Sequence, residues 1–261
     1  MKGGMVLRRL FDLSGKTALI TGGGSGLGKL MAEVYAEYGA NIAICSRKLN
    51  VCLETAEEIA QKYEVKTAAF ACNVSDEGDV KRTVKEVIST FGKIDILVNN
   101  SGATWGEKVE DMPLAAWDKV MNVNATGTFL MCKEAGRHML EKNNGKIINI
   151  GSVAGLKAEP KEVLNAIGYS TSKAAIHHFT KDLARKWAGN NITVNAIAPG
   201  FFETKMTKQT LEEKGNEIKF KNPMGKFGDE QSIKGTALLL ASNASDYITG
   251  QIIAVDGGSS L

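Results

Sequence analysis

The sequence predicts a single α/β domain in which helices cover both faces of a doubly wound, seven-stranded parallel sheet. Two observations lead to this prediction: seven short apolar runs recur along the chain, and longer stretches with helical patterns separate them. The runs are almost continuously apolar rather than alternating, which is typical of strands covered on both faces. Right-handed crossovers bring the carboxyl ends of such strands to one edge of the sheet, and we expect ligand chemistry there.

The expected strands and helices alternate from the first run to the last. The strands are Thr17–Ile20, Asn41–Cys45, Thr67–Cys72, Ile94–Val98, Lys146–Ile150, Ile192–Ile197 and Ile252–Val255. The helices between them span 26–38, 51–63, 77–91, 114–141, 170–188 and 229–242, each long enough for one crossover. We expect one domain over residues 1–261, with 1–14 as an N-terminal extension. The polar segment 201–222, with scattered Phe and Met side chains, is expected to form a helical or mobile substrate lid.

The composition is that of a globular protein with a large core. Hydrophobic residues make up 43% of the 261 residues and charged residues 23%, which is too apolar for a disordered chain. The formal net charge of +3 is not gathered into a basic stripe, which argues against nucleic acid as the main partner. The four cysteines form no CxxC or Cys/His pairing, so neither a metal site nor a disulfide framework is indicated. No leader-like or membrane-spanning run is visible, and we expect a reducing, cytoplasmic location without a membrane partner.

A cluster of glycines follows the first expected strand. The segment Thr21-Gly-Gly-Gly-Ser-Gly-Leu-Gly28 runs directly into a helical pattern, with a TGxxxGxG spacing rather than GxGxxG. Glycines let the backbone turn tightly and bring its N–H groups close to a pyrophosphate at a helix N-terminus. Such a cluster can also be a plain turn, but a strand before it and a helix after it are the context that phosphate binding requires.

The end of the second expected strand indicates which dinucleotide binds. Ser46 and Arg47 stand where a carboxylate would hydrogen-bond the adenosine ribose and repel a 2′-phosphate. A small hydroxyl and a planar cation suit a phosphate instead, which favours NADP(H) over NAD(H). Alternatively, Arg47 and Lys48 form only a solvated approach to the next helix. Asn73 and Val74, after the third strand, are candidates for the adenine pocket, although Asn73 could equally cap the following helix.

Three polar side chains form a candidate catalytic group. Tyr169 and Lys173 are four residues apart, so they share one face of a predicted helix. A nearby ammonium favours the phenolate, and we expect it to lower the pKa of Tyr169 into a range useful for proton transfer to a ketone oxygen. Ser152 follows the fifth strand, where its hydroxyl can hydrogen-bond the same oxygen. Each feature also occurs without function, the Tyr/Lys pair on exposed helices and the serine in glycine turns.

From the glycine loop to the C-terminus, the chain resembles the short-chain dehydrogenase/reductase family. The motifs that carry this resemblance are, in order, Thr21-Gly-x-x-x-Gly26-x-Gly28, Asn99-Asn-Ser-Gly102, Asn124 in Asn-Val-Asn-Ala-Thr-Gly, Ser152, Tyr169-x-x-x-Lys173, Pro199-Gly-Phe-Phe-Glu-Thr204 and Val255-Asp-Gly-Gly258. The resemblance implies a Rossmann-like fold and an NADP-dependent oxidoreductase that acts on CH–OH or C=O groups. The order and spacing of the motifs together are far more specific than any one of them.

The resemblance also implies a role for each motif. Tyr169 would be the general acid/base, Ser152 would orient the carbonyl, and Lys173 would lower the Tyr pKa and hold the nicotinamide ribose. Asn124 would bend the central helix and anchor a water that links Lys173 to bulk solvent. Asn100 and Gly102 would pack beside the adenosine side of the cofactor, whereas Pro199, Gly200 and Thr204 would hold its nicotinamide end. The catalytic candidates are Asn124, Ser152, Tyr169 and Lys173. The cofactor-binding candidates are Gly22, Ser25, Gly26, Leu27, Gly28, Ser46, Arg47, Asn73, Val74, Asn100, Gly102, Tyr169, Lys173, Pro199, Gly200, Phe202 and Thr204.

The chain departs from the family pattern at three places. Ser101 replaces the usual alanine, a small polar change that we expect to be tolerated, and Asn73 replaces a common aspartate. Sixteen residues separate Ser152 from Tyr169, a longer gap than is usual in the family. The additional residues fall within Leu156–Ile167, beside the expected substrate mouth, so they bear on the size of the substrate.

Within the family, the chain looks most similar to NADPH-dependent 3-oxoacyl-[acyl-carrier-protein] reductases, including the rhamnolipid-pathway type. The stretches 99–106, 150–155 and 195–200 carry this similarity. It implies reduction of a 3-oxoacyl thioester to the 3-hydroxyacyl product with Tyr169 as general acid. Sugar or polyol dehydrogenases of the gluconate type share many of the same motifs and are an alternative. A non-catalytic dinucleotide-binding protein is a further alternative, although such a chain can lose the Ser, Tyr or Lys that this one keeps.

Two protein partners follow from the resemblance. An acyl carrier protein would need basic residues near the mouth, and Lys205, Lys208 and Lys219 are candidates, although lysines on an exposed helix are often only solvated. The family pairs helices across two-fold axes, which implies a homo-tetramer. The contacts would involve Ala174–Trp187, 229–242 and the Gly250–Leu261 tail.

Overall fold

The computed structural model describes residues 9–204 and 207–261. Within them, seven parallel strands form one sheet in the order β3-β2-β1-β4-β5-β6-β7. The strands are β1 (Thr17–Thr21), β2 (Asn41–Ser46), β3 (Thr67–Ala71), β4 (Ile96–Asn99), β5 (Gly145–Ile150), β6 (Ile192–Pro199) and β7 (Ile252–Val255). The order reverses between β1 and β4, which places a ligand crevice at the carboxyl ends of these strands. The predicted doubly wound, seven-stranded parallel sheet is confirmed.

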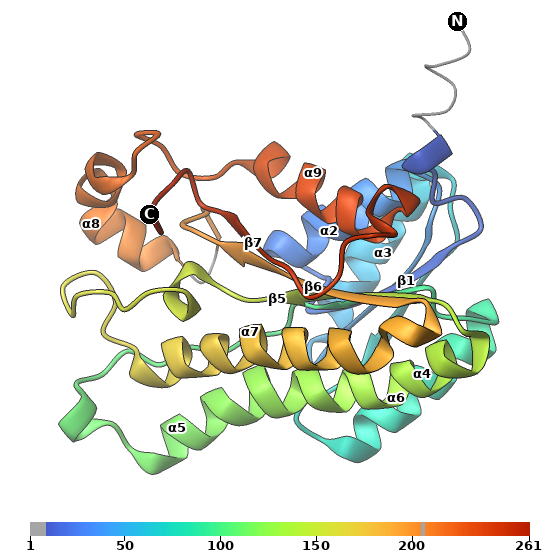
Figure 1. Ribbon diagram of the computed structural model, residues 1–261, viewed down its shortest axis with the longest axis horizontal. Helices are drawn as coiled ribbons and strands as arrows, with labels where there is room; N and C mark the ends of the chain where they lie inside the picture. Colours follow the sequence, from blue (N-terminus) through green and yellow to red (C-terminus); the bar gives the residue numbers. More distant parts are fainter. Residues whose placement is uncertain (1–8, 205–206) are drawn as a thin grey trace, which may run out of the picture.

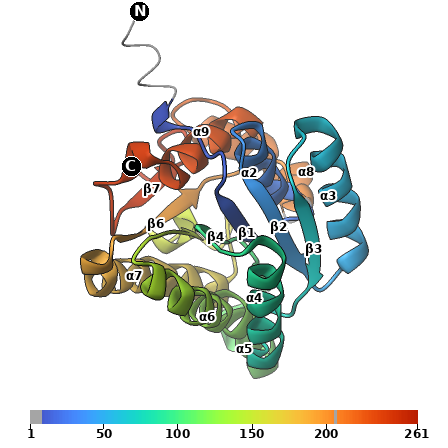
Figure 2. The same ribbon diagram turned by 90° about the vertical axis from the view of Figure 1, so that its right-hand side faces the viewer.

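Helices cover both faces of the sheet, as Figures 1 and 2 show. One face carries α2 (Gly26–Glu37), α3 (Leu49–Tyr63) and α9 (Glu230–Ala241), and the other carries α4 (Glu77–Phe91), α6 (Gly127–Lys142) and α7 (Ile167–Trp187). Side chains of the buried strands alternate between the two layers, so Ala18 and Ile20 enter one core cluster while Leu19 enters the other. Burial on both faces explains why these strands read as continuous apolar runs.

The helix expected over residues 114–141 is interrupted near its middle. It consists of α5 (Leu114–Met121), a π-helical turn η2 (Asn122–Thr126) and α6. The side chain of Asn124 bonds to the backbone of Ala103 and to Ser172, which lie outside this helix. The wide turn therefore depends on tertiary contacts, which the spacing of apolar residues in the sequence does not reveal.

The segment expected as a lid contains the helix α8 (Lys208–Lys221). Among the α8 side chains that the structure describes, Ile218 alone is buried. Hydrogen bonds fasten both ends of the helix: Thr204 bonds to Thr207 before it, and Asn222 Nδ2 donates to the Asp256 carbonyl at 2.8 Å after it. Shorter helical turns are η1 (Val109–Asp111), η3 (Val153–Gly155), η4 (Ala188–Asn190) and η5 (Asn243–Ser245). No helix in the described ranges is long and apolar enough to cross a membrane.

Candidate active site

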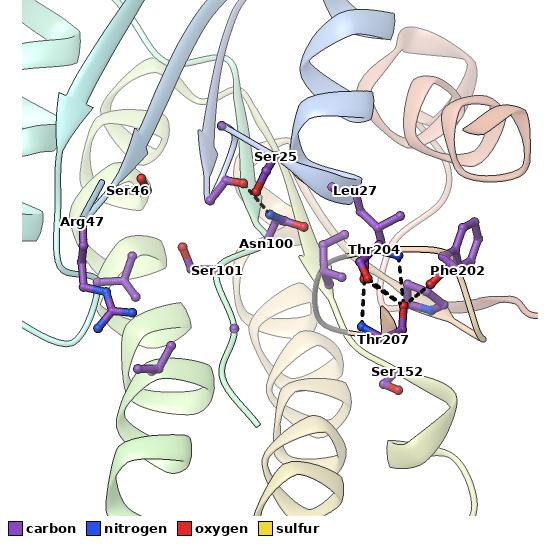
Figure 3. A pocket seen from close by; sticks show the side chains of 18 of the residues that line it. Ser25, Leu27, Ser46, Arg47, Asn100, Ser101, Ser152, Phe202, Thr204 and Thr207 are labelled. Atoms are coloured by element: carbon purple, nitrogen blue, oxygen red, sulfur yellow. Dashed lines mark hydrogen bonds between the residues drawn. The ribbon is translucent and has the colours of Figure 1, made fainter. Parts of the chain in front are cut away.

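A cavity of about 420 Å³ lies at the carboxyl ends of the central strands. Figure 3 shows Arg47 at one end of it and Ser152 at the other, with Ser25 and Asn100 between them. The lining residues are Gly22, Gly24, Ser25, Gly26, Leu27, Ser46, Arg47, Lys48, Val51, Cys72, Asn73, Val74, Asn100, Ser101, Gly102, Val123, Ile150, Gly151, Ser152, Tyr169, Lys173, Pro199, Gly200, Phe202, Thr204 and Thr207. The cavity therefore brings together all of the predicted site residues except Gly28 and Asn124.

The glycine loop between β1 and α2 forms the middle of the cavity wall. Gly22 and Gly26 have φ angles of +65° and +54°, a region that side chains disfavour. Asn100 fixes the loop, because its Nδ2 donates to the carbonyls of Thr21 and Gly22 at 3.0 and 3.1 Å. The loop opens at the N-terminus of α2, where free backbone N–H groups favour an anion such as a pyrophosphate.

Gly28 lies behind this wall rather than in it. A Cβ on Gly28 would lie 2.4 Å from the Gly22 carbonyl oxygen and 2.5 Å from Asn100 Nδ2. The absence of a side chain lets α2 approach the loop, and the contact of Gly28 with the cofactor stays a prediction.

The predicted adenosine end of the cavity carries a cation that is not engaged in an ion pair. Arg47 is exposed, and within the described part of the chain it makes no ion pair or hydrogen bond. The Ser46 hydroxyl donates to the Lys48 carbonyl at 3.2 Å and accepts from the Lys48 N–H at 3.1 Å, which orders the turn that presents Arg47. A planar guanidinium beside an ordered turn suits a phosphate group.

Asn73 lines the same end and does not cap the following helix. Its Oδ1 accepts hydrogen bonds from the N–H and hydroxyl of Ser75 at 3.3 and 2.9 Å. The N-cap of α4 is Asp76, whose side chain accepts from the Asp79 N–H at 2.7 Å. The alternative in which Asn73 serves as the cap is therefore wrong.

Ser152, Tyr169 and Lys173 meet at the opposite end of the cavity. Lys173 is 4% exposed, and its Nζ donates to the Ile150 carbonyl at 2.7 Å and lies 5.6 Å from the centre of the Tyr169 ring. Burial lowers the pKa of Lys173 to about 8. Burial also raises the pKa of Tyr169 above its ordinary value, and the neighbouring Ser152 side chain lowers it in part. The expected lowering of the Tyr169 pKa by Lys173 is not found, because desolvation of the phenol outweighs the effect of its neighbours.

Asn124 braces the site from outside the cavity. It is fully buried, and its side chain exchanges two hydrogen bonds with the Ala103 backbone: Oδ1 accepts from the N–H at 2.7 Å and Nδ2 donates to the carbonyl at 2.9 Å. The same Nδ2 donates to the Ser172 hydroxyl at 2.8 Å, one residue before Lys173. Asn124 thus links η2, the loop after β4 and α7.

A further part of the cavity wall follows β6. Pro199, Gly200, Phe202 and Thr204 line it as predicted, and Thr207 joins them. The Thr204 and Thr207 hydroxyls lie 3.1 Å apart, and Thr207 also donates to the Phe202 carbonyl (Figure 3).

Nine lining residues were missed by the sequence reasoning. They are Gly24, Lys48, Val51, Cys72, Ser101, Val123, Ile150, Gly151 and Thr207. Most are direct neighbours of predicted residues at the carboxyl ends of strands. They would have been found if the whole turn after each strand had been included. Val51, Val123 and Thr207 lie at or near helix beginnings and in η2, where no motif marks them.

A glycine-rich first turn that opens on a cavity ending in Ser, Tyr and Lys defines a dinucleotide-dependent oxidoreductase. Comparison with known proteins agrees. The family model described as "Enoyl-(Acyl carrier protein) reductase" matches residues 22–260. The chain belongs to the short-chain dehydrogenase/reductase family.

Relatives that are named for different activities resemble the chain to a similar degree. It is 41% identical to the 2-dehydro-3-deoxy-D-gluconate 5-dehydrogenase of Bacillus subtilis (strain 168), over 97% of each chain. It is 39% identical to the 3-oxoacyl-[acyl-carrier-protein] reductase FabG of Aquifex aeolicus (strain VF5), over 94% of this chain and 98% of that one. Among solved structures, the Pseudomonas aeruginosa RhlG/NADP active-site complex has a TM-score of 0.91 and 34% identity, over 97% of this chain and 99% of that one.

These findings establish the reaction class. The protein is an oxidoreductase that acts on CH–OH or C=O groups with a nicotinamide dinucleotide. Because one relative is named for a sugar acid and another for an acyl thioester, family membership leaves the substrate open.

Proposed function

We propose that the protein is an NADPH-dependent reductase that converts 3-oxoacyl thioesters into 3-hydroxyacyl products, with Tyr169 as the general acid. The observation that carries this proposal is the arrangement of the cavity, with the free Arg47 guanidinium at one end and Ser152, Tyr169 and Lys173 at the other. Similarity to acyl-carrier-protein reductases over almost the whole chain supports the substrate class.

The residues present fit a bound NADP(H). Gly22, Gly26 and the N-terminus of α2 would hold the pyrophosphate, and Ser46 with Arg47 would hold the 2′-phosphate. The remaining predicted contacts would follow the wall: Asn73, Val74, Asn100 and Gly102 toward adenosine, and Pro199, Gly200, Phe202, Thr204, Tyr169 and Lys173 toward nicotinamide. When bound in its reduced form, this cofactor supplies a hydride to the carbonyl carbon.

The chain's own groups would handle the carbonyl oxygen. The Ser152 Oγ accepts from the Ala154 N–H at 3.2 Å, which leaves its own proton available to the substrate oxygen. The raised pKa of Tyr169 keeps the phenol protonated at neutral pH, so it can donate that proton to the oxygen. Lys173, beside the Tyr169 ring, would offset the negative charge that the phenol acquires.

Exposed apolar side chains beside the mouth favour an acyl substrate over a polyol. The mouth segment (residues 156–166) meets the loop after β4 where the Glu107 N–H donates to the Asn165 carbonyl at 2.9 Å. Trp105 is 40% exposed, and Leu156 and Ile167 are 44% and 41% exposed, in or beside these two segments. Exposed apolar side chains near an active site suit an acyl chain.

The substrate lid over residues 201–222 also belongs to this proposal. A second cavity of about 940 Å³ separates α8 from Ser25 and Gly26 and leaves room for the helix to move. For an acyl carrier protein, Lys208 and Lys219 are exposed on α8, whereas Lys205 lies outside the described residues.

We further propose a homo-tetramer in a reducing cytoplasm. Phe129 of α6 is 48% exposed and packs edge-to-face against Phe179 of α7 at 6.5 Å, an aromatic pair that a subunit contact would cover. The contacts expected through α7, α9 and Gly250–Leu261 would complete the assembly. All four cysteines are free and buried, which suits a reducing compartment.

A substrate panel tests the proposal. Purified protein should oxidise NADPH with a 3-oxoacyl thioester, measured by loss of nicotinamide absorbance. A sugar acid or polyol that turns over with NADP while acyl thioesters stay inert would favour the gluconate-type alternative. Failure of every carbonyl and alcohol would contradict the assignment as an enzyme and favour a dinucleotide-binding protein.

A further inference from the structure

One face of α7 carries three residues spaced four apart: Tyr169, Lys173 and His177. Residues at this spacing lie in one row along a helix. The row faces the end of β5, where Lys173 holds the Ile150 carbonyl. The reaction as described uses the first two residues and gives His177 no task.

His177 lies against the backbone that carries Ser152. Its Nε2 accepts a hydrogen bond from the Ser152 N–H at 3.4 Å. β5 ends at Ile150, and the Gly151 N–H is the last to reach β6, donating to the Ile197 carbonyl at 2.7 Å. The Ser152 N–H is therefore the first amide without a strand partner, and a buried amide needs an acceptor.

The contact leaves no room for a side chain on the intervening residue. A Cβ on Gly151 would lie 2.1 Å from His177 Nε2 and 2.7 Å from its Cδ2. One turn further along, a Cβ on Gly155 would lie 2.6 Å from the Lys173 carbonyl carbon. The turn from Gly151 to Gly155 thus sits directly on α7 at two points, which sets the position of Ser152 relative to Tyr169.

The protonation state of His177 suits this contact. The ring is 6% exposed, and its Nδ1 is buried without a hydrogen bond in the described structure. Because Nε2 accepts, a neutral ring carries its proton on Nδ1. Burial lowers the pKa of His177 to about 4, against a smaller opposing effect of the Gly155 backbone, so the ring is neutral near pH 7.

We propose that His177 is a positioning residue for the reductase reaction: its imidazole holds the Ser152 N–H and thereby fixes the Ser152 hydroxyl opposite Tyr169. The inference rests on the proposed function, since it requires Ser152 to act on the substrate oxygen. Loss of the acceptor should misplace the Ser152 hydroxyl without altering the residues proposed to hold the cofactor. Small misplacements of reacting groups lower the reaction rate strongly.

Two substitutions distinguish the loss of the hydrogen-bond acceptor from the loss of the ring's volume. His177→Leu removes the acceptor, and we expect kcat to fall roughly 10- to 100-fold while the KM for NADPH stays within about twofold. His177→Gln places an amide oxygen near the position of Nε2, and it should recover most of that loss. As a control, His138→Leu removes the other buried histidine, on α6, and should leave kcat unchanged. Equal losses in the Leu and Gln variants, or full activity in the Leu variant, would overturn the proposal.

A double-mutant cycle excludes a merely structural role. In a Ser152→Ala background, His177→Leu should reduce kcat by less than about twofold, because its effect acts through Ser152. An undiminished additional loss in that background would contradict the proposal.

Nitrogen NMR of the His177 ring provides a readout that needs no turnover. We expect the Nδ1–H tautomer in the cofactor-free protein, with an Ser152 amide signal that shifts in the Leu variant and less in the Gln variant. An Nε2–H tautomer would refute the inference. If the NMR result holds while no substrate turns over, the proposed function fails and the contact with Ser152 stands.

Discussion

The two sides of the active-site cavity are built in different ways. The side proposed for the cofactor consists of strand ends and the turns that follow them, in which Asn100 holds the glycine loop through two hydrogen bonds of 3.0 and 3.1 Å. The side proposed for the substrate consists of the mouth segment and α8, which are held through long lysine side chains. Lys214 of α8 reaches the Glu162 carbonyl in the mouth segment, and Lys157 of the mouth segment reaches the Ser259 carbonyl in the C-terminal tail.

Such a difference would let relatives that share the chemistry differ in the substrates for which they are named. Groups held by buried backbone contacts tolerate little displacement, whereas exposed segments can change with little effect on the fold. Substitutions on the cofactor side should therefore alter catalysis or cofactor choice strongly, and substitutions at the mouth should alter substrate affinity weakly.

The largest effect is expected from Tyr169→Phe. Loss of the phenolic proton donor should reduce kcat by roughly 10³-fold, because general acid catalysis contributes about 10²- to 10⁴-fold. Binding of NADPH, followed by its fluorescence, should change little. Tyr38→Phe is the matched control, since Tyr38 is 39% exposed and lies outside the cavity. Retention of more than a tenth of the wild-type kcat would contradict the role of Tyr169.

His177 should impose a pH dependence on stability. Its pKa is about 4 in the folded protein against an ordinary 6.5, so the unfolded chain binds more protons between these values. This contribution to the free energy of unfolding is fully present above pH 6.5 and is lost as the pH falls to about 4, a change of about 3 kcal/mol. Besides the Gly155 backbone, the charges of Lys173 and Lys181 bear on the ring.

Urea unfolding from pH 4 to 7 measures this slope. His177→Gln should flatten it, whereas the substitution of its exposed neighbour, His178→Gln, should not. Indistinguishable slopes for wild type and His177→Gln would show that the ring titrates normally.

Arg47→Asp tests the other end of the cofactor wall. Replacing the free guanidinium by a carboxylate should shift the ratio of kcat/KM values from NADPH toward NADH by roughly 10- to 100-fold, because a charge-assisted contact becomes a repulsion. Arg47→Lys keeps the charge and should retain part of the preference. If the unmodified enzyme used both cofactors equally well, Arg47 would have no role in discrimination.

The smallest effect is expected at the mouth. Lys157→Met combined with Lys214→Met removes the lysine contacts of the mouth segment and should raise the KM for an acyl thioester by about two- to fivefold, with kcat nearly unchanged. Lys161→Met is the control, since Lys161 lies on the same segment and makes no ion pair or hydrogen bond within the described structure. A large fall in kcat would show that the mouth and the catalytic group are coupled.

The sequence predicted the sheet well because five of its strands, β1, β2, β4, β5 and β6, are largely buried between the two helix layers. Such strands appear as separate apolar runs, and the observed bounds coincide with the predicted ones at seven of the fourteen strand ends and differ by one or two residues at the other seven. Most of the cavity wall was also predictable, since strand ends and glycines mark it locally.

What escaped prediction depends on contacts between distant segments. The π-helical turn follows from bonds of Asn124 to Ala103 and Ser172, and the packing role of Gly28 follows from its distance to Gly22. The raised pKa of Tyr169 depends on burial, which spacing along a helix does not reveal. His177 carries no recognisable motif, and only its position against Ser152 distinguishes it.

The π-helical turn also rotates α6 about the helix axis relative to α5. It winds in an additional residue between α5 and α6, so side chains beyond it are rotated by about 100° relative to an uninterrupted helix. The direction in which α6 presents Phe129 to the surface is therefore set by the same turn that aims Asn124 at Ala103. Deleting one residue from Asn122–Thr126 would remove this rotation and redirect both side chains at once. The same turn therefore determines both the outer face of α6 and the bracing of the active site.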